Sequence, residues 1–265
     1  MSRPEILFPL FAGLDTLEGV GPKTAQHLAA LEITRPRDLI FTLPHSGVDR
    51  SRRATVQGAE IPGVVTVEVT VGQHRPNTRK GGPYRIVVED AATSFQLVFF
   101  RSQGDYLKRA LPTGARRVVS GKVELFDGVA QMVHPDHVLA VDEAHEIPAF
   151  EPVYPLTAGV TQRVMARAVQ AALTRVPDLK EWIDPVQKAQ AGWPDWAAAV
   201  RAAHAPERAQ DLSPSHPARE RLAYDELMAH QLTLALARAR LRRAKGRATV
   251  GTGALQARVL EALPY

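Results

Sequence analysis

The sequence contains no cysteine, and none of its apolar runs is long enough to cross a membrane. Without cysteine the chain can form neither disulfides nor thiolate metal sites, which fits a reducing compartment. A membrane-spanning helix needs about 20 consecutive apolar residues. The opening segment, MSRPEILFPLF, is also too short and too interrupted by proline for a secretory signal. These absences predict a cytoplasmic protein with no membrane partner.

Motifs for catalysis are missing as well. The sequence has no G-x-x-x-x-G-K-[ST] phosphate loop followed by an acidic metal-binding motif, so we expect no ATP hydrolysis by this chain. The segment His134-Pro135-Asp136-His137 lacks a nearby third ligand, and we interpret it as a polar turn rather than a metal site. Asp225 and Glu226 are neighbours on a predicted helix and face different directions, which argues against a pair of catalytic carboxylates. We therefore expect no catalytic residue, metal or cofactor in this chain.

The composition is that of a globular protein. The 265 residues are 45% hydrophobic and 23% charged, with a net charge of +5 at pH 7. This length is enough for two or three domains, each with its own core. Most of the positive excess lies in residues 211–265. An excess of this size fits a polyanionic partner but does not by itself specify one.

The first patterned segment is a glycine-rich turn before a helix. Gly19-Val20-Gly21-Pro22 predicts a tight hairpin, and the apolar spacing within residues 23–31 predicts the helix after it. In such a helix-hairpin-helix pattern, backbone N–H groups at the helix N-terminus can bind a phosphate. Gly19, Gly21 and Lys23 are therefore candidate phosphate contacts. The alternative is a hairpin that only packs two helices together. A second apolar helix face is predicted at residues 39–43, before Pro44.

A run of β-branched residues predicts a small barrel. Alternating apolar residues predict strands at 64–72, 84–89, 95–100, 117–125 and 129–133, with the turn Asp127-Gly128 between the last two. A short helix is expected at residues 105–111, between the third and fourth strands. Five short strands with a helix at this position are typical of an OB barrel. Gly72 and Gly121 lie inside strand patterns, where a barrel needs sharp bends.

Aromatic and basic residues gather at one part of this barrel. Neighbouring side chains of a strand point to opposite faces, so one ring of the Phe99-Phe100 pair should face outward unless both faces are covered. An outward ring, with Tyr106, would form a platform on which a nucleobase stacks. Basic residues near these rings are expected to contact phosphates. In the connection between the first two strands they are Arg75, Arg79, Lys80 and Arg85, and around Tyr106 they are Arg101, Lys108, Arg109, Arg116 and Arg117. A solvated loop with incidental charge is the alternative for the first group.

Six segments together resemble one family. In order they are GVGPKTAQHLAAL, DLIFTLPHSGVDR, FF followed by YLKRAL, VVSGKVELFDGVAQMVHPDH, VYPLTAGVTQRVMARAVQAAL and PARERLAYDELMAHQLTLALARAR. They resemble successive segments of RecG, the bacterial ATP-dependent DNA helicases that remodel stalled forks. The chain departs from the usual pattern at RSQGD, which lengthens the segment before Tyr106, and at Gly47, where a tyrosine is common.

The resemblance implies a function that the residues alone do not specify. It implies a wedge region with an OB barrel that lies at a three-way DNA junction and splits strands while a separate motor translocates on duplex. In that arrangement Phe99 or Phe100, with Tyr106, stacks at the branch point. The implied partners are branched DNA, namely replication forks and three- and four-way junctions. ATP and magnesium are implied only for the motor, which in the family begins just beyond a segment such as the final EALPY.

The remaining chain is predicted to be helical. Prolines interrupt a connector at residues 146–155, and Thr161 is a suitable N-cap for a helix at 161–175. We interpret Trp182, Trp193 and Trp196 as packing residues rather than a base cage. One long helix is expected from Pro217 to about residue 245, with acidic residues near its start, basic residues near its end and a heptad stripe of leucines at 227, 234 and 241. We expect it to brace a following domain, with duplex phosphate contact as the alternative.

The sequence thus predicts an α+β chain of four parts. Residues 1–60 form a helical, helix-hairpin-helix-like unit, 61–145 an OB-type wedge barrel, 146–216 a Pro- and Trp-rich helical connector, and 217–265 a long helix with a linker. We expect a monomer that binds branched DNA. Two alternatives remain open: an OB module that only docks a protein, for instance single-strand-binding protein, and an OB module that binds RNA.

Overall fold

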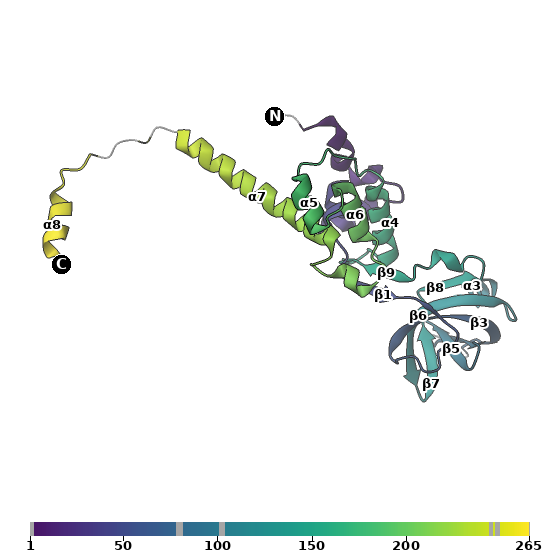
Figure 1. Ribbon diagram of the computed structural model, residues 1–265. Coiled ribbons are helices and arrows are strands. Elements are labelled where there is room, and N and C mark those ends of the chain that lie inside the picture. The colour runs from purple at the N-terminus through teal and green to yellow at the C-terminus, as the bar shows by residue number, and fades with distance from the viewer. Residues whose placement is uncertain (1–2, 78–81, 101–103, 244–245, 247–249, 265) are drawn as a thin grey trace. The chain divides into compact units, whose positions relative to one another are not determined.

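The computed structural model describes residues 3–77, 82–100, 104–243, 246 and 250–264. The chain divides into two compact units, Met1–Leu222 and Ala223–Tyr265. The first unit holds a β-barrel and a group of helices (Figure 1). The chain passes from the helices to the barrel near Arg50 and returns to the helices near Glu151, so the barrel is inserted within the helical part.

The barrel consists of five strands. They are β3 (Gly63–Arg75), β4 (Tyr84–Glu89), β5 (Ser94–Phe99), β6 (Arg116–Phe126) and β7 (Val129–Val133), with α3 (Gly104–Ala110) between β5 and β6. The strands pair in the order β3-β4-β5-β7-β6, and β6 pairs back onto β3 to close the barrel. The β5–β7 pair is parallel and the others are antiparallel. This confirms the predicted OB barrel, and each predicted strand lies within a few residues of the observed one.

The strand pattern in the sequence explains the barrel interior. Val65, Val67, Val69 and Val71 alternate along β3 and are all buried in the barrel core, because every second side chain of a strand points to the same face. The bend at Gly72 coincides with a register shift between Val71 and His74. Asp127 and Gly128 both have positive φ angles, 49° and 77°, which is the backbone of the tight two-residue hairpin between β6 and β7.

Four short strands were missed by the sequence patterns. β2 (Arg52–Arg53) extends the barrel sheet beside β3, and β8 (His137–Ala140) extends it beside β6. β1 (Ser46–Asp49) and β9 (Phe150–Val153) form a separate antiparallel pair where the helical part adjoins the barrel. At Gly47 an added side chain would collide with the Phe150 ring, so the glycine at this position accommodates a large residue on the paired strand.

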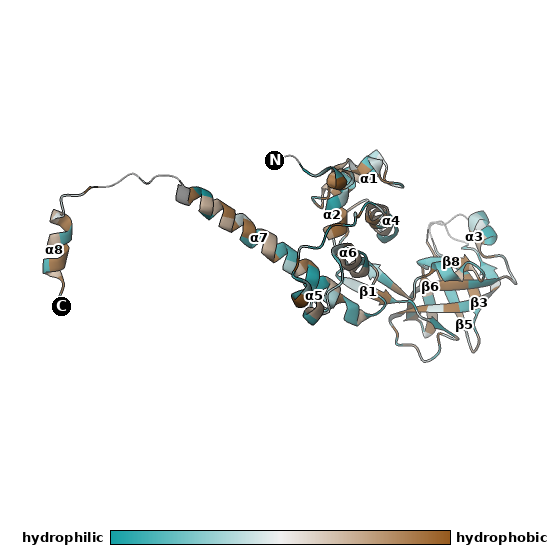
Figure 2. Cartoon of the chain, turned by 45° about the horizontal axis from the view of Figure 1, so that its top comes forward, coloured by the Kyte–Doolittle hydropathy of each residue, from teal (hydrophilic) through white to brown (hydrophobic). Residues whose placement is uncertain are grey.

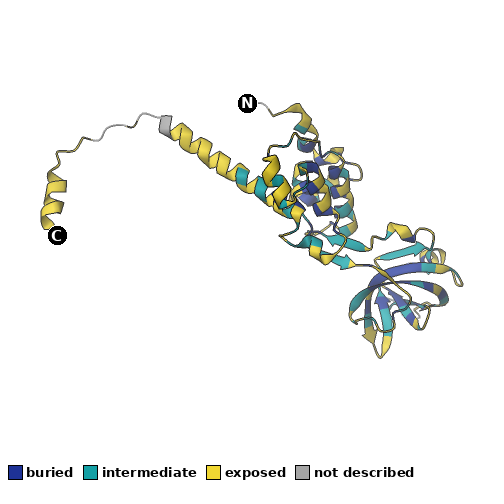
Figure 3. Ribbon diagram, viewed as in Figure 1, coloured by how far each residue is buried: buried dark blue, intermediate teal, exposed yellow. Residues whose placement is uncertain are grey.

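The helices of the first unit come from two distant parts of the chain, and most of them contribute to one core. They are η1 (Glu5–Phe11), η2 (Leu14–Thr16), α1 (Pro22–Ala29), α2 (Pro36–Phe41), η3 (Ala144–Glu146), α4 (Gln162–Leu173), α5 (Pro185–Ala191), α6 (Trp196–His204) and η4 (Ala209–Leu212), where η denotes a 3₁₀ helix. Leu28, Leu39 and Ile40 pack with Met165 and Val200 in this core. The predicted regions 1–60 and 146–216 therefore share a single hydrophobic core, shown in dark blue in Figure 3.

Two predictions about the helical part need correction. Phe41 does not belong to the apolar face of its helix, because its side chain is 59% exposed while Leu39 and Ile40 are fully buried. Trp182 is also largely exposed and lies 6.0 Å from the Arg221 guanidinium, whereas Trp196 packs against the core as predicted.

The second unit begins within a long helix. α7 (Pro217–Arg243) matches the predicted long helix, and α8 (Ala254–Ala262) follows it. Every residue from Ala229 to Leu241 is exposed, and so is Leu227, so all three leucines of the predicted heptad stripe are exposed. Apolar and polar residues alternate along this helix, as the brown and teal segments of Figure 2 show. No helix in the described part of the chain is long and apolar enough to span a membrane.

Candidate nucleic-acid interface

The strand register brings the predicted site residues to one end of the barrel, here called the α3 end. The last residue of β3, Arg75, pairs with Arg85 of β4, and Tyr84 pairs with Phe99 of β5. The first residue of β6, Arg116, pairs with Thr70 of β3. The ends of these four strands and α3 therefore meet around a common rim.

The two phenylalanines at the end of β5 have different environments. Phe99 follows Phe95 and Leu97 into the barrel core and is only 9% exposed. Phe100 points outward and is 45% exposed. Its backbone N–H donates to Nε2 of His134 at 3.1 Å, and the His134 ring lies 5.9 Å from the Phe100 ring. The prediction that one ring faces outward is confirmed, and the outward ring is Phe100. Phe99 does not offer an open face for stacking.

Helix α3 is anchored to the barrel by leucines and presents its polar side outward. Leu107 and Leu111 lie one turn apart and are both buried in the barrel core. Tyr106 is 61% exposed, and Lys108 and Arg109 are exposed too. His74 of β3 fixes the end of this helix, because one ring nitrogen bonds the Leu111 carbonyl at 2.8 Å and the other bonds the Tyr84 hydroxyl at 3.0 Å. No sequence pattern had selected His74.

The predicted cations of this rim fall into two groups. Arg117 is half-buried and donates to the carbonyls of Ala110 and Arg116 at 3.0 and 2.9 Å, so it caps the C-terminus of α3. Arg116 is ion-paired with Glu68. By contrast, Arg85, Lys108 and Arg109 have no ion-pair or hydrogen-bond partner among the described residues, and Arg75 is exposed with one bond to Gln73. Arg79, Lys80 and Arg101 lie outside the described residues.

The glycine hairpin belongs to the helical part of the chain and not to the barrel strands that form this rim. Gly19 has a φ of +76°, and a side chain there would come within 2.7 Å of Cδ of Arg167 on α4. Gly21 has open space around its Cα, and Lys23 is exposed in the first turn of α1. The hairpin thus packs against α4 on one side and leaves its second glycine accessible. Phosphate contact by Gly19, Gly21 and Lys23 stays a prediction.

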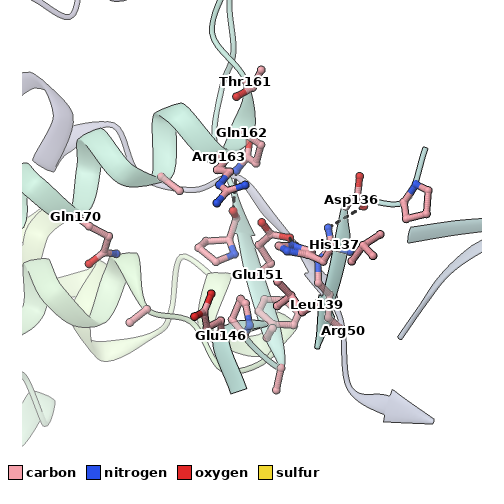
Figure 4. Close-up of a pocket in the computed structure, with 18 of the residues that line it drawn as sticks. Arg50, Asp136, His137, Leu139, Glu146, Glu151, Thr161, Gln162, Arg163 and Gln170 are labelled. Atoms are coloured by element: carbon pink, nitrogen blue, oxygen red, sulfur yellow. Dashed lines mark hydrogen bonds and ion pairs between the residues drawn. The ribbon is translucent and has the colours of Figure 1, made fainter. Parts of the chain in front are cut away.

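A cavity of about 1330 Å³ lies where the barrel meets the helices. Tyr106 and Leu107 of α3 line it together with β8, β9 and the first turns of α4. Figure 4 shows Gln162 and Arg163 at the start of α4 on one side of this cavity, Asp136 and His137 on another, and Glu151 between them. The exposed ring of Tyr106 therefore belongs both to the α3 end and to the wall of this cavity.

Arg50 joins the elements beneath the cavity. Its side chain is 6% exposed, and it donates to the Ser120 hydroxyl at 2.8 Å, to Asp136 at 3.0 Å and to Glu151. These partners lie on β6, on the β7–β8 connection and on β9. Ser120 in turn bonds the buried Thr66 hydroxyl at 2.8 Å. Reasoning from the sequence missed Arg50, because its partners lie 70 or more residues away along the chain.

The carboxylate of Glu151 is held in its charged form. The neighbouring His137 ring, 3.7 Å away, and the charge of Arg50 lower the pKa of Glu151 below its ordinary value, although burial acts in the opposite direction. Within the segment His134-Pro135-Asp136-His137, His134 contacts Phe100, Asp136 contacts Arg50 and His137 contacts Glu151. No group of three metal-ligating side chains occurs among the described residues. The arrangement contains hydrogen-bond donors, cations and exposed rings, which can bind a ligand.

The closed strand order and the helix between the third and fourth strands define an OB-fold protein, here inserted into a helical unit. The family described as the RecG wedge domain matches residues 14–176. The chain therefore belongs to the RecG wedge domain family. The match includes the barrel, the β1–β9 pair and α4.

Relatives from several bacteria have a similar region. The ATP-dependent DNA helicase RecG of Escherichia coli O127:H6 is 28% identical over 270 residues, which cover 95% of this chain and 37% of that protein. The proteins of the same name from Acidithiobacillus ferridurans and Bacillus subtilis are each 28% identical, over 85% and 82% of this chain and 32% and 31% of theirs. The chain thus spans about a third of the length of these relatives.

One solved structure resembles the whole chain. The structure of RecG bound to a three-way DNA junction matches with a TM-score of 0.70 and 25% sequence identity. The match covers 100% of this chain and 36% of that one. The fold of this chain is therefore similar to that of the corresponding region of RecG.

Proposed function

We propose that this chain binds branched DNA and acts as the strand-separating wedge of a RecG-like helicase at stalled replication forks and recombination intermediates. The observation that carries the proposal is the outward ring of Phe100 at a rim that also holds Tyr106 and unpaired cations. The similarity of this chain to the structure of RecG bound to a three-way DNA junction supports the same function. The motor that would use ATP and magnesium belongs to the part of such a helicase beyond these residues.

The rim offers two kinds of interaction with DNA, stacking on bases and contact with phosphates. Exposed aromatic rings stack on unpaired bases of any sequence, at about 1–3 kcal/mol per base. Such bases are available only where a duplex has parted, so stacking on Phe100 and Tyr106 favours a junction over a continuous duplex. Contacts with phosphates would add affinity without regard to sequence, and this affinity falls as the salt concentration rises, because the release of counterions from the DNA becomes less favourable. The residues expected to make these contacts are Arg75, Arg85, Lys108 and Arg109. Stacking supplies the preference for branched DNA, and the cations supply most of the affinity.

Binding of a fork and of a blunt duplex of equal length, measured by fluorescence anisotropy at one salt concentration, tests this proposal. We expect tighter binding to the fork, and we expect Phe100→Ala with Tyr106→Ala to remove most of that preference. Phe41→Ala is the matched control, because that phenylalanine is similarly exposed but lies on α2. Equal affinity for fork and duplex in the unaltered chain would contradict the proposal.

The salt dependence of DNA binding tests the contribution of the rim cations. For Arg85→Gln we expect weaker binding to every DNA and a salt dependence that is shallower by about one phosphate contact. Arg208→Gln is the control, since Arg208 is exposed on the helical part and ion-paired with Asp211. A salt dependence that both substitutions change equally would indicate an effect of net charge rather than of this rim.

The alternative of a protein-docking module predicts a different result. If the OB barrel served only to bind a protein such as single-strand-binding protein, the ring substitutions would leave fork binding unchanged in a folded chain. Competition with RNA tests the remaining alternative in the same assay. We further infer that the protein acts as a monomer in the cytoplasm, where its proposed DNA substrates occur.

A further inference from the structure

The outer face of α4 carries a row of exposed polar residues. Arg163, Arg167 and Gln170 are all exposed, and their spacings of four and three residues place them on one side of the helix. The opposite side of α4 is buried in the helical core. The helix contains no acidic residue, so the charge on its outer face is entirely positive.

The fold makes no use of the two arginines in this row. Arg163 and Arg167 have no ion-pair or hydrogen-bond partner among the described residues. Glu146 and Glu207 line the same cavity as Arg163 but form no ion pair with it. Arg175, just beyond the end of the helix, differs from them because it donates to oxygens of η1 and η2 and so fixes α4 in place. The guanidinium groups of the row therefore keep their N–H donors for a ligand, and their planar shape suits phosphate.

The row connects the cavity with the glycine hairpin. Arg163 lines the cavity at the start of α4 (Figure 4), and Tyr106 belongs to the wall of the same cavity. Arg167 lies against Gly19, where an added side chain would come within 2.7 Å of its Cδ. Lys23 is exposed four residues after Gly19 and adds a third cation. Positive charge thus continues from the cavity next to the rim to the hairpin.

We propose that this face of α4 binds phosphates of one of the two duplex arms that diverge at the rim, so that the arm lies along the helical part. The inference rests on the proposed function and adds a duplex site outside the barrel. Arg163 and Arg167 lie one helical turn apart, about 6 Å along the axis. Phosphates two positions apart on one strand advance by about 7 Å along a duplex, so the two arginines can contact one strand of the arm.

The absence of rings from this row favours a duplex over an unpaired strand. None of the three exposed residues of the row is aromatic. Surfaces that hold unpaired strands combine cations with aromatic rings on which the bases stack. Contact with phosphates alone suits a duplex, because its bases are already paired and stacked. The rim and α4 would therefore bind different parts of the same junction.

A three-way junction and a splayed fork with the same branch-point sequence test this site. Both contain the same duplex ahead of the branch point, but the two diverging arms are duplex in the junction and single strands in the fork. We expect Arg163→Gln with Arg167→Gln to weaken binding of the junction by roughly 10- to 60-fold at about 0.1 M salt, and to make its salt dependence shallower by about two phosphate contacts. The splayed fork lacks the arm that α4 would hold, so its affinity should stay close to that of the unaltered chain.

Two further double variants are the controls. Arg37→Gln with Arg201→Gln removes the same charge from exposed positions of α2 and α6, and we expect it to weaken the junction much less. Arg163→Lys with Arg167→Lys should retain most of the affinity, because each side chain keeps its charge. The midpoint of urea unfolding should be the same for the α4 glutamine variant as for the unaltered chain, since its two arginines are exposed and make no bond in the fold.

The outcomes separate this site from the proposed function. An equal loss in the two double glutamine variants would indicate an effect of net charge and overturn the inference, and so would an equal loss for junction and splayed fork. If the α4 variant binds both DNAs normally while Phe100→Ala with Tyr106→Ala removes the preference for a fork over a duplex, the α4 site is overturned and the proposed function stands. Equal binding of fork and duplex by the unaltered chain would overturn the proposed function and this inference with it.

Discussion

At the scale of single residues, Arg50 determines how the barrel is attached to the helical part. Its buried guanidinium bonds Ser120, Asp136 and Glu151 at once. Replacement by methionine, which has a similar length but no charge, would leave the Glu151 carboxylate and the Ser120 hydroxyl without this donor. We expect Arg50→Met to lower the free energy of unfolding by about 3–5 kcal/mol, measured by urea denaturation.

Arg52→Met provides the comparison, because Arg52 is only two residues away and forms an ion pair with Glu68 at 3.2 Å while its side chain is 49% exposed. An exposed pair of this kind is worth about 0–1 kcal/mol. A similar loss in both variants would show that the burial of Arg50 has no special consequence.

Only some of the site residues could be predicted correctly from the sequence. Alternation along β5 predicted that one of two adjacent rings faces outward, but it could not say which, because the inward face depends on pairing with β4 and β7. Arg117 looked like a free cation in the sequence, yet it caps α3. The role of Arg50 could not be predicted, because its hydrogen-bond partners are far from it along the chain and only the fold brings them together.

At the scale of elements, α3 depends on two leucines and offers its other side to a ligand. We expect Leu107→Ala to lower the free energy of unfolding by about 2–5 kcal/mol, since it leaves a cavity in the barrel core. Tyr106→Ala on the same helix should change stability by less than about 0.5 kcal/mol, because Tyr106 is exposed. Thermal and urea unfolding measure both. A large loss in Tyr106→Ala would mean that its effect on DNA binding reflects folding.

Long elements were predicted well, and short ones were not. The five barrel strands have alternating patterns over several residues, and α7 is a long run rich in strong helix formers without an internal glycine or proline, so the local sequence was sufficient. β1 and β9 have four residues each and include glycine or proline, residues that weaken a strand pattern. They are strands because they pair with each other, which no local pattern could indicate.

At the scale of the whole molecule, the helical core joins segments separated by the barrel. Leu28 and Ile40 from one side of the insertion pack with Met165 and Val200 from the other. The prediction of separate regions 1–60 and 146–216 followed composition along the chain, and composition carries no information about which distant helices pack together. The barrel, whose strand contacts lie within one stretch of sequence, was predicted more completely.

Acid stability is a property of the whole first unit, because hydrogen-bonded carboxylates connect its parts. The pKa of Glu181 is held well below its ordinary 4.5, first by hydrogen bonds from Arg221, which is fully buried on α7. The pKa of Glu151 is also lowered, by His137 and Arg50. A carboxylate whose pKa is lower in the folded state stabilises it above the unfolded pKa, and this stabilisation is lost as pH falls through the folded pKa.

His204 acts in the same direction at higher pH. It bonds Tyr154 at 3.1 Å and the Ile40 carbonyl at 3.0 Å, and burial lowers its pKa below 6.5. Because the unfolded chain then takes up the proton first, stability begins to decline as pH falls below about 6.5. We therefore expect the free energy of unfolding to fall in two stages, a first one below about pH 6.5 and a second below about pH 4.5.

Glu181→Gln separates the carboxylate contribution from the rest. At pH 7 the variant lacks the charged partner of Arg221, and we expect it to be about 1.5–3 kcal/mol less stable than the unaltered chain. In acid that difference should shrink, because below about pH 4.5 residue 181 of the unfolded chain takes up a proton while the folded chain keeps Glu181 charged, which favours the unfolded state of the unaltered chain. Urea denaturation from pH 7 to pH 3 measures the difference at each pH. A difference that stays constant over this range would show that packing around residue 181, rather than its charge, stabilises the junction between α7 and the helical core.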